Sequence, residues 1–244
     1  MEKVELIWKN GEFVPWDEAN VHVLSHGLHY GSGVFEGIRC YDTEIGPAIF
    51  RHQDHLDRLA KSAELYYLQL PHSLEEIREG TKELIRRNGL RSCYIRPIAF
   101  RGYGEMGLYA KSAPVDVFVA VWPWGAYLGE EGKQKGVRAK VSSWRRISAA
   151  GLIPHAKASG QYLNSVLAKI ESLKAGYEEA ILLDERGMVC EGTGENIFVV
   201  RDGVINTPGP VTREIQQAFE DALHGRSERY ADWLDVVPQP APAT

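Results

Sequence analysis

The sequence has few cysteines, no excess of positive charge and no long apolar run. Its three cysteines, Cys40, Cys93 and Cys190, form no Cys-x-x-Cys pair, which argues against a disulfide framework and a zinc site. Lys and Arg total 28 against 33 Asp and Glu, and the basic residues are scattered, which disfavours nucleic-acid binding. No run is apolar for long enough to cross a bilayer. We therefore expect a cytoplasmic protein whose partners are small molecules, not nucleic acid or membrane.

The 244 residues are 44% hydrophobic and 25% charged, which is enough for a substantial core. Pattern changes along the chain predict an α+β fold in two domains. Residues 1–122 read as an N-terminal α+β domain and residues 137–244 as a C-terminal domain. Between them, residues 123–136 carry four glycines and no apolar periodicity, so we expect a linker or lid.

The N-terminal domain combines strand and helix signals. "VELIWKNGEFVP" predicts a hairpin around Asn10-Gly11, and "GVFEGIRCY" and "PAIFRH" predict further strands. Apolar positions at helical spacing predict one helix from about Asp54. Ser73 and Glu76 form a capping-box pattern that opens a second helix, which Gly89 is placed to end. "SCYIRPIAF" and "PVDVFVAVWPW" then predict two buried strands.

In the C-terminal domain, "VRAKVSSW" predicts a strand, and a helix follows from Tyr162 to Gly176. The segments "EAILLD", "MVCEG", "ENIFVV" and "GVINTP" predict short strands at the spacing of a barrel-like or sandwich-like meander. A last helix has apolar residues on one face over residues 211–223, and the Pro/Ala-rich end from Pro238 is expected to fray.

Several familiar motifs are absent or unconvincing. Gly31, Gly33 and Gly37 are spaced as GxGxxxG before a predicted strand, which favours tight backbone packing over a dinucleotide site. The neighbouring histidines at 22, 26 and 29 lack acidic or thiolate companions at ligand spacing, so we predict no metal site. No GxSxG motif is present, which removes the commonest serine-hydrolase signature.

Lys157 lies among small, uncharged neighbours in "IPHAKASGQY". A lysine at such a strand-to-helix junction can be desolvated and become a nucleophilic amine, although a solvated surface lysine is the ordinary alternative. Its companions favour the first interpretation. Tyr162 offers a phenol, Glu191 a carboxylate among glycines, and Arg58 a bidentate fork for phosphate. These four groups match what pyridoxal phosphate requires; taken singly, they remain compatible with a core tyrosine, a turn glutamate and a surface arginine.

Longer stretches then resemble a known family. "HVLSHGLHYGSGVFEGIRCY", "RHQDHLDRL", "YIRP", "PWGAYL", "AKASGQYLNS", "EGTGENIF" and "GPVTREIQQAFEDALHG" resemble, in order, the bacterial branched-chain-amino-acid aminotransferases. These belong to the D-amino-acid-aminotransferase-like class of pyridoxal-phosphate enzymes, called fold type IV. The resemblance implies a small α/β N-terminal domain, a barrel-like C-terminal domain and a homodimer or larger homo-oligomer.

The resemblance also assigns roles. Lys157 would bond the pyridoxal phosphate, Tyr162 would contact its 3-oxygen, Glu191 its ring nitrogen and Arg58 its phosphate. Five further residues would form the substrate pocket, with Arg96 or nearby backbone receiving carboxylates: Tyr30, Phe35, Arg96, Trp124 and Tyr127.

The expected activity is transamination between branched-chain L-amino acids and 2-oxoglutarate, in branched-chain amino-acid biosynthesis. A D-amino-acid transaminase or an aminodeoxychorismate lyase is the alternative within the same class. The alternative that is not an active enzyme is a catalytically silent form of the same family that binds no cofactor.

One departure from the family favours that silent form. Pro208 runs directly into Gly209-Pro210, whereas family members carry several dozen residues there, including two turns that bind the cofactor phosphate. The C-terminal domain is thus incomplete after Pro208. We expect the missing residues to exist but to be unseen, with a Cα gap above the 3.8 Å of a trans-peptide, and the cofactor to be absent or weakly held.

Overall fold

The computed structural model describes residues 2–125, 129–207 and 234–237, and the chain divides into two units. Unit 1 comprises Met1–Trp124, His155–Gly160 and Asp232–Thr244, and unit 2 comprises Gly125–Pro154 and Gln161–Ala231. The short segment that carries Lys157 therefore packs with unit 1, although the chain around it belongs to unit 2.

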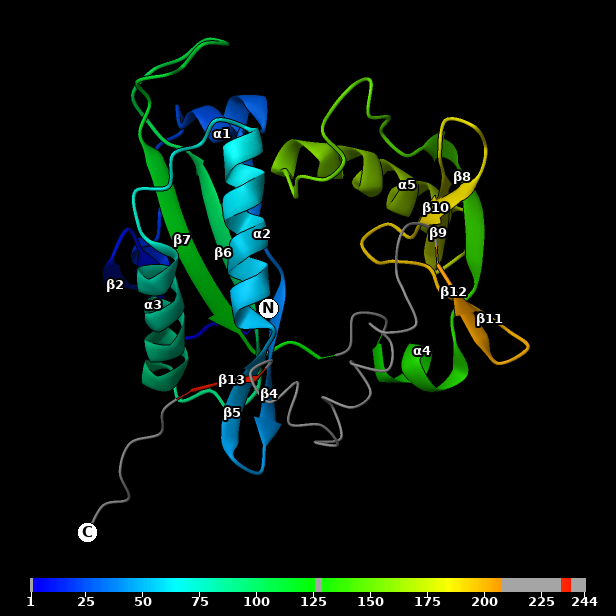
Figure 1. The fold of residues 1–244 in the computed structure, drawn as a ribbon, viewed down its shortest axis with the longest axis horizontal. Helices are drawn as coiled ribbons and strands as arrows, with labels where there is room; N and C mark the ends of the chain where they lie inside the picture. Colours follow the sequence, from blue (N-terminus) through cyan, green and yellow to red (C-terminus); the bar gives the residue numbers. More distant parts are fainter. Residues whose placement is uncertain (1, 126–128, 208–233, 238–244) are drawn as a thin grey trace. The chain divides into compact units, whose positions relative to one another are not determined.

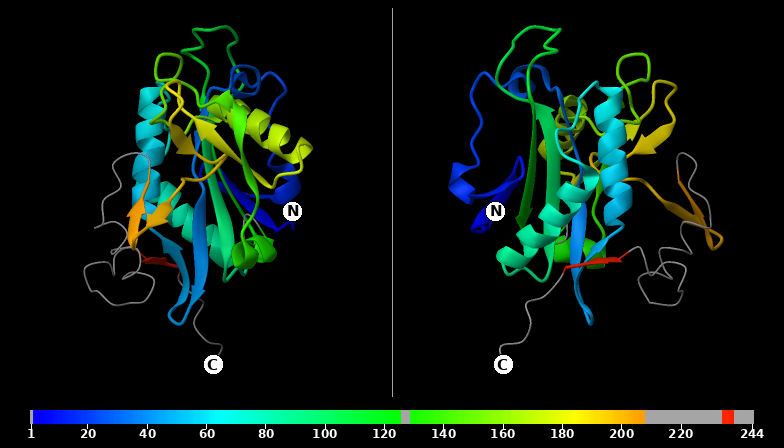
Figure 2. Two further views of the ribbon diagram at one scale, coloured as in Figure 1. Left: turned by 90° about the vertical axis from the view of Figure 1, so that its right-hand side faces the viewer. Right: turned by 60° about the vertical axis from the view of Figure 1, so that its left-hand side comes forward.

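Unit 1 is built on one eight-stranded antiparallel sheet (Figure 1). Its main path runs β13-β5-β4-β6-β7-β1-β2, and β3 pairs with β6 beside this path. The strands are β1 (Leu6–Lys9), β2 (Glu12–Pro15), β3 (Gly33–Phe35), β4 (Ile38–Thr43), β5 (Gly46–Phe50), β6 (Cys93–Arg101), β7 (Val115–Trp122) and β13 (Leu234–Val236). The long strands β6 and β7 lie side by side in both views of Figure 2.

The predicted hairpin is confirmed. β1 and β2 pair with Lys9 opposite Glu12, and the two residues between them, Asn10 and Gly11, have φ of 48° and 91°. Positive φ at both central positions belongs to the type I′ turn, whose twist matches that of the flanking strands. The Asn-Gly pair thus sets the register of this edge of the sheet.

Helices α2 (His52–Leu65) and α3 (Leu74–Arg87) cover one face of the sheet, while α1 (His26–Tyr30) and the 3-10 turn Trp16–Glu18 are short. The capping box is confirmed: the backbone of Glu76 donates to the Ser73 hydroxyl at 3.2 Å, and the Glu76 carboxylate accepts from the Ser73 backbone at 2.7 Å. Such a cap stabilises a helix by about 1 kcal/mol. Gly89 ends α3 with φ of 64°, as predicted.

The main core lies between the two helices and the sheet. Leu56 and Leu59 of α2 and Ile77 of α3 are fully buried against apolar residues of β4, β6 and β7. Along β6, Cys93 and Ile95 are buried and their neighbours Tyr94 and Arg96 are only half-buried. Because successive side chains of a strand alternate between faces, Tyr94 and Arg96 lie on the face opposite this core.

Unit 2 contains α4 (Gly129–Lys135), β8 (Ala139–Arg145), α5 (Tyr162–Lys174), β9 (Glu179–Leu183), β10 (Val189–Glu191), β11 (Val199–Arg201) and β12 (Val204–Asn206). The 3-10 turn Ser159–Gln161 precedes α5. β8 and β9 are parallel with α5 between them in sequence, β9 and β10 are antiparallel, and β11 and β12 form a separate hairpin. The meander predicted over β9 to β12 is found only in part, because β9–β10 and β11–β12 are antiparallel pairs that belong to two separate small sheets.

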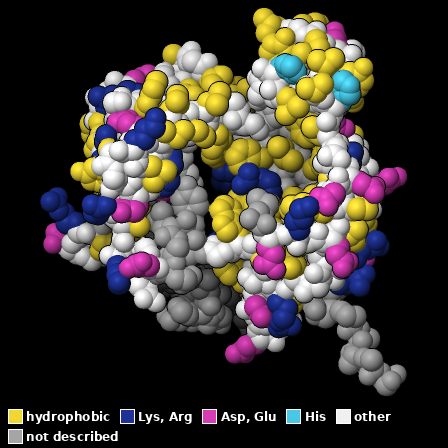
Figure 3. Space-filling view, turned by 180° about the vertical axis from the view of Figure 1, so that it is seen from behind, with side chains coloured by type: hydrophobic (Ala, Val, Ile, Leu, Met, Phe, Trp, Pro, Cys, Tyr) yellow, Lys and Arg dark blue, Asp and Glu magenta, His cyan; other side chains and the backbone are white. Residues whose placement is uncertain are grey.

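The apolar face of α5 is largely exposed (Figure 3). Leu163 is 70% exposed and Leu173 is 56% exposed, although both are large apolar side chains that ordinarily pack inward. Among the described residues of unit 2, the buried apolar cluster consists of Ala168, Ala180 and Leu182. The described part of this unit therefore has a far smaller core than the described part of unit 1.

The segment predicted to be a structureless linker, residues 123–136, contains α4. The sequence pattern gave no sign of this helix, because glycine disfavours helix formation and the segment lacks apolar periodicity. The predicted helix over 211–223, the junction at Pro208 and the end from Pro238 lie outside the described residues. Among those that are described, no helix is both long and apolar enough to cross a membrane.

Candidate active site

The segment around Lys157 forms a short edge beside β3. Its carbonyl accepts a hydrogen bond from the backbone of Phe35 at 3.0 Å, and its own N–H donates to the hydroxyl of Ser62 on α2 at 3.0 Å. Val34 and Ala158 form an isolated antiparallel bridge. A strand and a helix of unit 1 thus fix the Lys157 backbone.

Small residues make this close approach possible. A Cβ on Gly31 would lie 2.9 Å from the Cα of Gly160, and Gly31 also has φ of 65°. Ala156 and Ala158, on either side of Lys157, are each 3% exposed. The run of small residues that made Lys157 conspicuous in the sequence therefore reflects tight backbone packing.

The Lys157 side chain lies beside two pocket residues predicted from the resemblance. Its Nζ is 5.3 Å from the centre of the Phe35 ring, and the guanidinium carbon of Arg96 is 4.6 Å from the same centre. Both separations are within the range of cation–π attraction. Lys157, Phe35 and Arg96 therefore form one cluster in unit 1.

Tyr94 extends this cluster to Trp124. Its hydroxyl accepts a hydrogen bond from Nη2 of Arg96 at 2.9 Å, and its ring packs edge-on against Trp124 with centres 4.6 Å apart. The carbonyl of Trp124 accepts from Nη1 of Arg39 at 2.8 Å. The sequence prediction missed Tyr94 and Arg39, although alternation along β4 and β6 could have placed both on this face.

Arg96 carries an unsatisfied buried donor. Its Nε is buried and has no hydrogen-bond partner among the described residues. Leaving such a donor unpaired costs about 1–3 kcal/mol, and more for a charged group. A guanidinium binds carboxylates through parallel N–H donors, so this arginine is suited to receive one.

Gly37 determines where Tyr94 can lie. A Cβ on Gly37 would come within 2.1 Å of the Tyr94 hydroxyl oxygen. We expect Gly37→Ala to displace Tyr94 and, with it, its contacts to Arg96 and Trp124. A displacement of about 1 Å can cost up to about 100-fold in rate.

The measurement is kcat/KM for the amino-transfer reaction that the sequence predicts, which we expect to fall between about 10-fold and 100-fold in Gly37→Ala. Gly125→Ala is the matched control, because nothing lies within 4 Å of a Cβ added there. Equal kinetics in the two variants would contradict this role of Gly37.

Arg58 is paired to a buried carboxylate. Its Nε and Nη2 donate to the two oxygens of Glu36 at 2.6 and 2.7 Å, and the Arg58 side chain is 51% exposed. Glu36 lies in the turn after β3 and is fully buried. The predicted phosphate ligand is thus a half-exposed guanidinium oriented by a partner that the sequence prediction did not identify.

In unit 2, Tyr162 opens α5 and is half-buried, and Glu191 ends β10. The Glu191 carboxylate forms an ion pair with Nε of Arg146, and their side chains are 30% and 17% exposed, respectively. The ion pair with Arg146 thus fixes the position of the Glu191 carboxylate at the end of β10.

Near Glu191, two glutamates share a proton. The Glu195 carboxyl is hydrogen-bonded to Glu179, whose oxygens also accept from Nζ of Lys169 and the hydroxyl of Thr193, both at 2.6 Å. Burial and the Glu179 carboxylate raise the pKa of Glu195 to about 7, whereas Lys169 and Thr193 overcome burial and lower the pKa of Glu179. Glu179 thus carries the charge and Glu195 carries the proton.

This pair predicts a pH-dependent stability. Because the folded chain binds the Glu195 proton more tightly than the unfolded chain does, its contribution is full below the ordinary pKa of 4.5 and is lost as pH rises through about 7. In Glu195→Gln the amide retains the hydrogen bond without titrating. We expect the melting temperature of the variant, relative to the wild type, to rise between pH 5 and 8.

Melting followed by circular dichroism checks this, with Glu131→Gln as the control because the Glu131 side chain is 80% exposed. A constant difference between wild type and Glu195→Gln across that pH range would contradict the shared proton.

Two residues predicted to line the substrate pocket, Tyr30 and Tyr127, are not among the contacts described above for the cluster of Lys157, Phe35 and Arg96. Tyr30 is 47% exposed, stacks on His26 with ring centres 4.5 Å apart, and lines a cavity of about 890 Å³ together with Arg101 and Tyr109. The Tyr30 ring also lies near the ring of His29. His26 and His29 both belong to α1, the helix that carries Tyr30. Tyr127 lies outside the described residues, as does the junction after Pro208.

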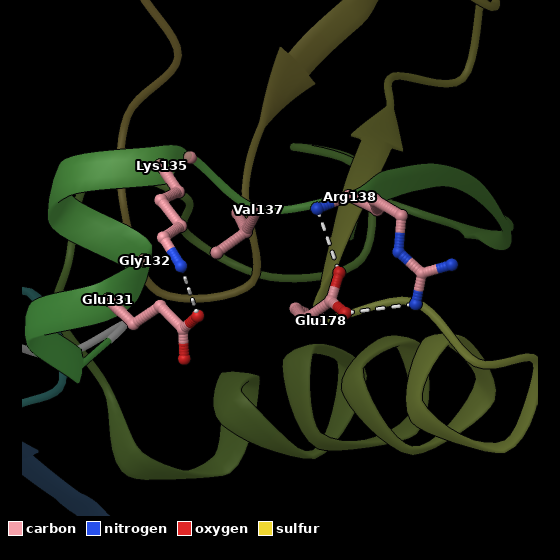
Figure 4. A pocket seen from close by; sticks show the side chains of 7 residues that line it. Glu131, Gly132, Lys135, Val137, Arg138 and Glu178 are labelled. Carbon is pink, nitrogen blue, oxygen red and sulfur yellow. Dashed lines mark hydrogen bonds and ion pairs between the residues drawn. The ribbon is translucent and has the colours of Figure 1, made fainter.

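A second cavity, of about 560 Å³, lies in unit 2 beside α4 and β8 (Figure 4). Its charged side chains pair with one another, Lys135 with Glu131 at 2.9 Å and Arg138 with Glu178 at 3.0 Å. All four side chains are at least 46% exposed. Such exposed pairs contribute little binding energy, so the cluster around Lys157 is the better candidate.

Comparison with known proteins identifies the family of the chain. Residues 33–216 match the family model described as "Amino-transferase class IV". The branched-chain-amino-acid aminotransferase of Pseudomonas aeruginosa is 50% identical over 298 aligned positions, which cover 95% of this chain and 97% of that protein. Because 298 positions exceed the 244 residues of this chain, that relative has several dozen positions without a counterpart here.

Solved structures give the same result. The T.th. branched-chain amino acid aminotransferase with pyridoxamine 5'-phosphate has a TM-score of 0.86 and 40% identity, covering 98% of this chain and 100% of that chain. The same protein complexed with N-(5'-phosphopyridoxyl)-L-glutamate has a TM-score of 0.85 and 38% identity, with the same coverage.

The expectation of a gap between Pro208 and Gly209 falls outside the residues that the structure describes and stays a prediction. By its matched residues, identity and fold, the chain belongs to the class IV aminotransferases, among the branched-chain-amino-acid aminotransferases.

Proposed function

We propose that this chain transfers amino groups between branched-chain L-amino acids and 2-oxoglutarate, with pyridoxal phosphate as its cofactor. The observation that carries the proposal is the cluster of Lys157, Phe35 and Arg96. In it, a lysine amine and a guanidinium whose Nε has no partner among the described residues lie at one aromatic ring. The T.th. structures with pyridoxamine phosphate and with a phosphopyridoxyl-glutamate adduct support both the cofactor and the glutamate/2-oxoglutarate pair.

The residues present fit the cofactor by the chemistry of their donors. Lys157 would hold its aldehyde carbon, Arg58 its phosphate, Glu191 its ring nitrogen and Tyr162 its 3-oxygen. When bound, pyridoxal phosphate supplies an electron sink that stabilises negative charge at the substrate α-carbon. The carboxylate of Glu191, held by Arg146, would keep the ring nitrogen protonated and so strengthen that sink.

Lys157 would also act as the general base. Its Nζ would take the proton from the substrate α-carbon as a general base and later return it as a general acid. Arg96 would receive the substrate carboxylate through the donor that has no partner in the described structure. Phe35, Trp124 and Tyr127 would provide apolar walls for branched side chains, and Tyr30 would contribute from α1.

A second candidate function is a catalytically silent form. The several dozen positions of the Pseudomonas aeruginosa relative that have no counterpart here favour it. We also propose a homodimer or larger homo-oligomer, which light scattering of the purified chain would measure.

Reductive trapping separates the two candidates. The chain would be incubated with pyridoxal phosphate, treated with borohydride, digested and analysed by peptide mass mapping. We expect a phosphopyridoxyl adduct on the peptide containing Lys157. Lys61→Ala, which removes a lysine that is 64% exposed, should leave the adduct unchanged, and Lys157→Ala should remove it. No adduct on the wild-type chain would support the silent form.

A further inference from the structure

Glu36 is a buried carboxylate with a full set of donors. Its Oε1 accepts from Nε of Arg58, and its Oε2 accepts from Nη2 of Arg58 and from Nδ1 of His55 at 2.9 Å. Since a carboxylate only accepts, Nδ1 of His55 carries a proton. The Glu36 backbone N–H donates to the carbonyl of Pro97 at 2.9 Å, so β6 also fixes this residue.

Glu36 stays charged despite its burial. Burial raises its pKa, but hydrogen bonds from Arg58 and His55 outweigh that effect and hold the pKa of Glu36 below its ordinary value. A buried carboxylate without such partners would take up a proton. The pair is therefore ionic in the neutral pH range.

The geometry restrains Arg58 more than a surface ion pair would. A bidentate guanidinium–carboxylate pair sets the plane of the fork, and Glu36, at 0% exposure, cannot change rotamer freely. An arginine side chain that is free in solution loses rotamer entropy when it is immobilised. With Glu36 in place, much of that loss has already occurred before a ligand binds.

We propose that Glu36 is a positioning residue that holds the Arg58 guanidinium in the orientation in which it binds the cofactor phosphate. This rests on the proposed function, which makes Arg58 a phosphate ligand. An opposing electrostatic effect exists, because a carboxylate beside Arg58 reduces the positive charge that a phosphate meets. If Glu36 positions Arg58, its removal weakens the binding of pyridoxal phosphate. If Glu36 mainly reduces the positive charge, its removal strengthens that binding.

The experiment compares two ligands that differ by the phosphate. Cofactor-free full-length chain is titrated with pyridoxal phosphate and with pyridoxal, and the dissociation constants are measured by absorbance. We expect Glu36→Gln to weaken pyridoxal phosphate binding about 10-fold and to leave pyridoxal binding unchanged. Glu64→Gln is the matched control on the same helix as Arg58, because Glu64 forms an exposed pair with Lys61.

Combining substitutions tests whether Glu36 acts through Arg58. We expect Arg58→Ala to weaken pyridoxal phosphate binding, and the double variant Glu36→Gln/Arg58→Ala to bind no more weakly than Arg58→Ala alone. At saturating cofactor, kcat of Glu36→Gln should stay within about twofold of the wild type, since no reacting atom is contacted.

Arg58→Lys covers the case in which Glu36→Gln does not fold. Lysine keeps the charge but cannot form the fork, so we expect it also to lose about 10-fold in pyridoxal phosphate affinity and none for pyridoxal.

Four outcomes would overturn the inference. They are equal weakening of both ligands in Glu36→Gln, unchanged or tighter pyridoxal phosphate binding in that variant, additive losses in the double variant, and wild-type affinity in Arg58→Lys. Unchanged binding in Arg58→Ala would instead remove Arg58 from the proposed function. No binding of pyridoxal phosphate by the wild type would overturn both.

Discussion

Lys157→Ala abolishes transamination, with a loss of about 10⁴-fold or more in kcat, because one substitution removes the group that bonds the cofactor and the base that moves the α-proton. The fold should be retained. Lys157 is flanked by Ala156 and Ala158, so alanine fits the backbone, and the Lys157 contact with Phe35 contributes only about 0.5–1 kcal/mol.

Two measurements check this prediction: amino transfer from leucine to 2-oxoglutarate, and the melting temperature. Lys61→Ala serves as the control in both, because Lys61 is an exposed lysine of unit 1. Turnover retained by Lys157→Ala would remove this lysine from the mechanism. Lost turnover together with a collapsed melting temperature would show a structural role instead.

Glu191→Gln has the second-largest expected effect. It should lower kcat by about 10²- to 10³-fold at saturating cofactor, because a neutral amide cannot hold the pyridine nitrogen protonated. The two side chains are nearly isosteric, and the amide carbonyl of the variant can still accept a hydrogen bond from Arg146. Cofactor affinity should therefore fall less than kcat does.

The kinetic isotope effect with α-deuterated leucine provides the sharper test. If removal of the α-proton becomes slower, the isotope effect on kcat should rise in Glu191→Gln. Glu185→Gln is the control, since Glu185 is an exposed residue of a neighbouring turn in unit 2. An unchanged rate in a cofactor-saturated assay would contradict the role assigned to Glu191.

The exposed apolar face of α5 bears on the silent alternative. Val166, Leu167 and Ile170 are each at least 42% exposed, and the aligned relative has several dozen positions that this chain lacks. A chain with so little core in one unit has less burial to offset the entropy of ordering that unit. Trapping at Lys157 and the melting experiments together show whether unit 2 is ordered enough to bind a cofactor.

Local rules were enough for the elements of unit 1. Asn10-Gly11 fixed a turn, Ser73 and Glu76 fixed a helix start, and alternation gave the strands, because each signal depends on neighbours in sequence. In unit 2 the same rules predicted β8, α5 and β9, but they missed α4, whose glycines disfavour a helix, and they did not give the parallel pairing of β8 with β9. Parallel pairing depends on contacts between strands distant in sequence.

By itself, the sequence determined the family and the α+β class, since those follow from motif order and from the pattern of residue types. It also predicted roles for Lys157, Arg58, Tyr162 and Glu191, which the proposed experiments test. Only the tertiary structure decided which groups accompany them. It placed Lys157 beside Phe35 and Arg96, and it paired Arg58 with the buried Glu36. These contacts join β3, α2, β6 and a segment about 60 residues beyond β6, and no local pattern encodes a contact between elements so far apart.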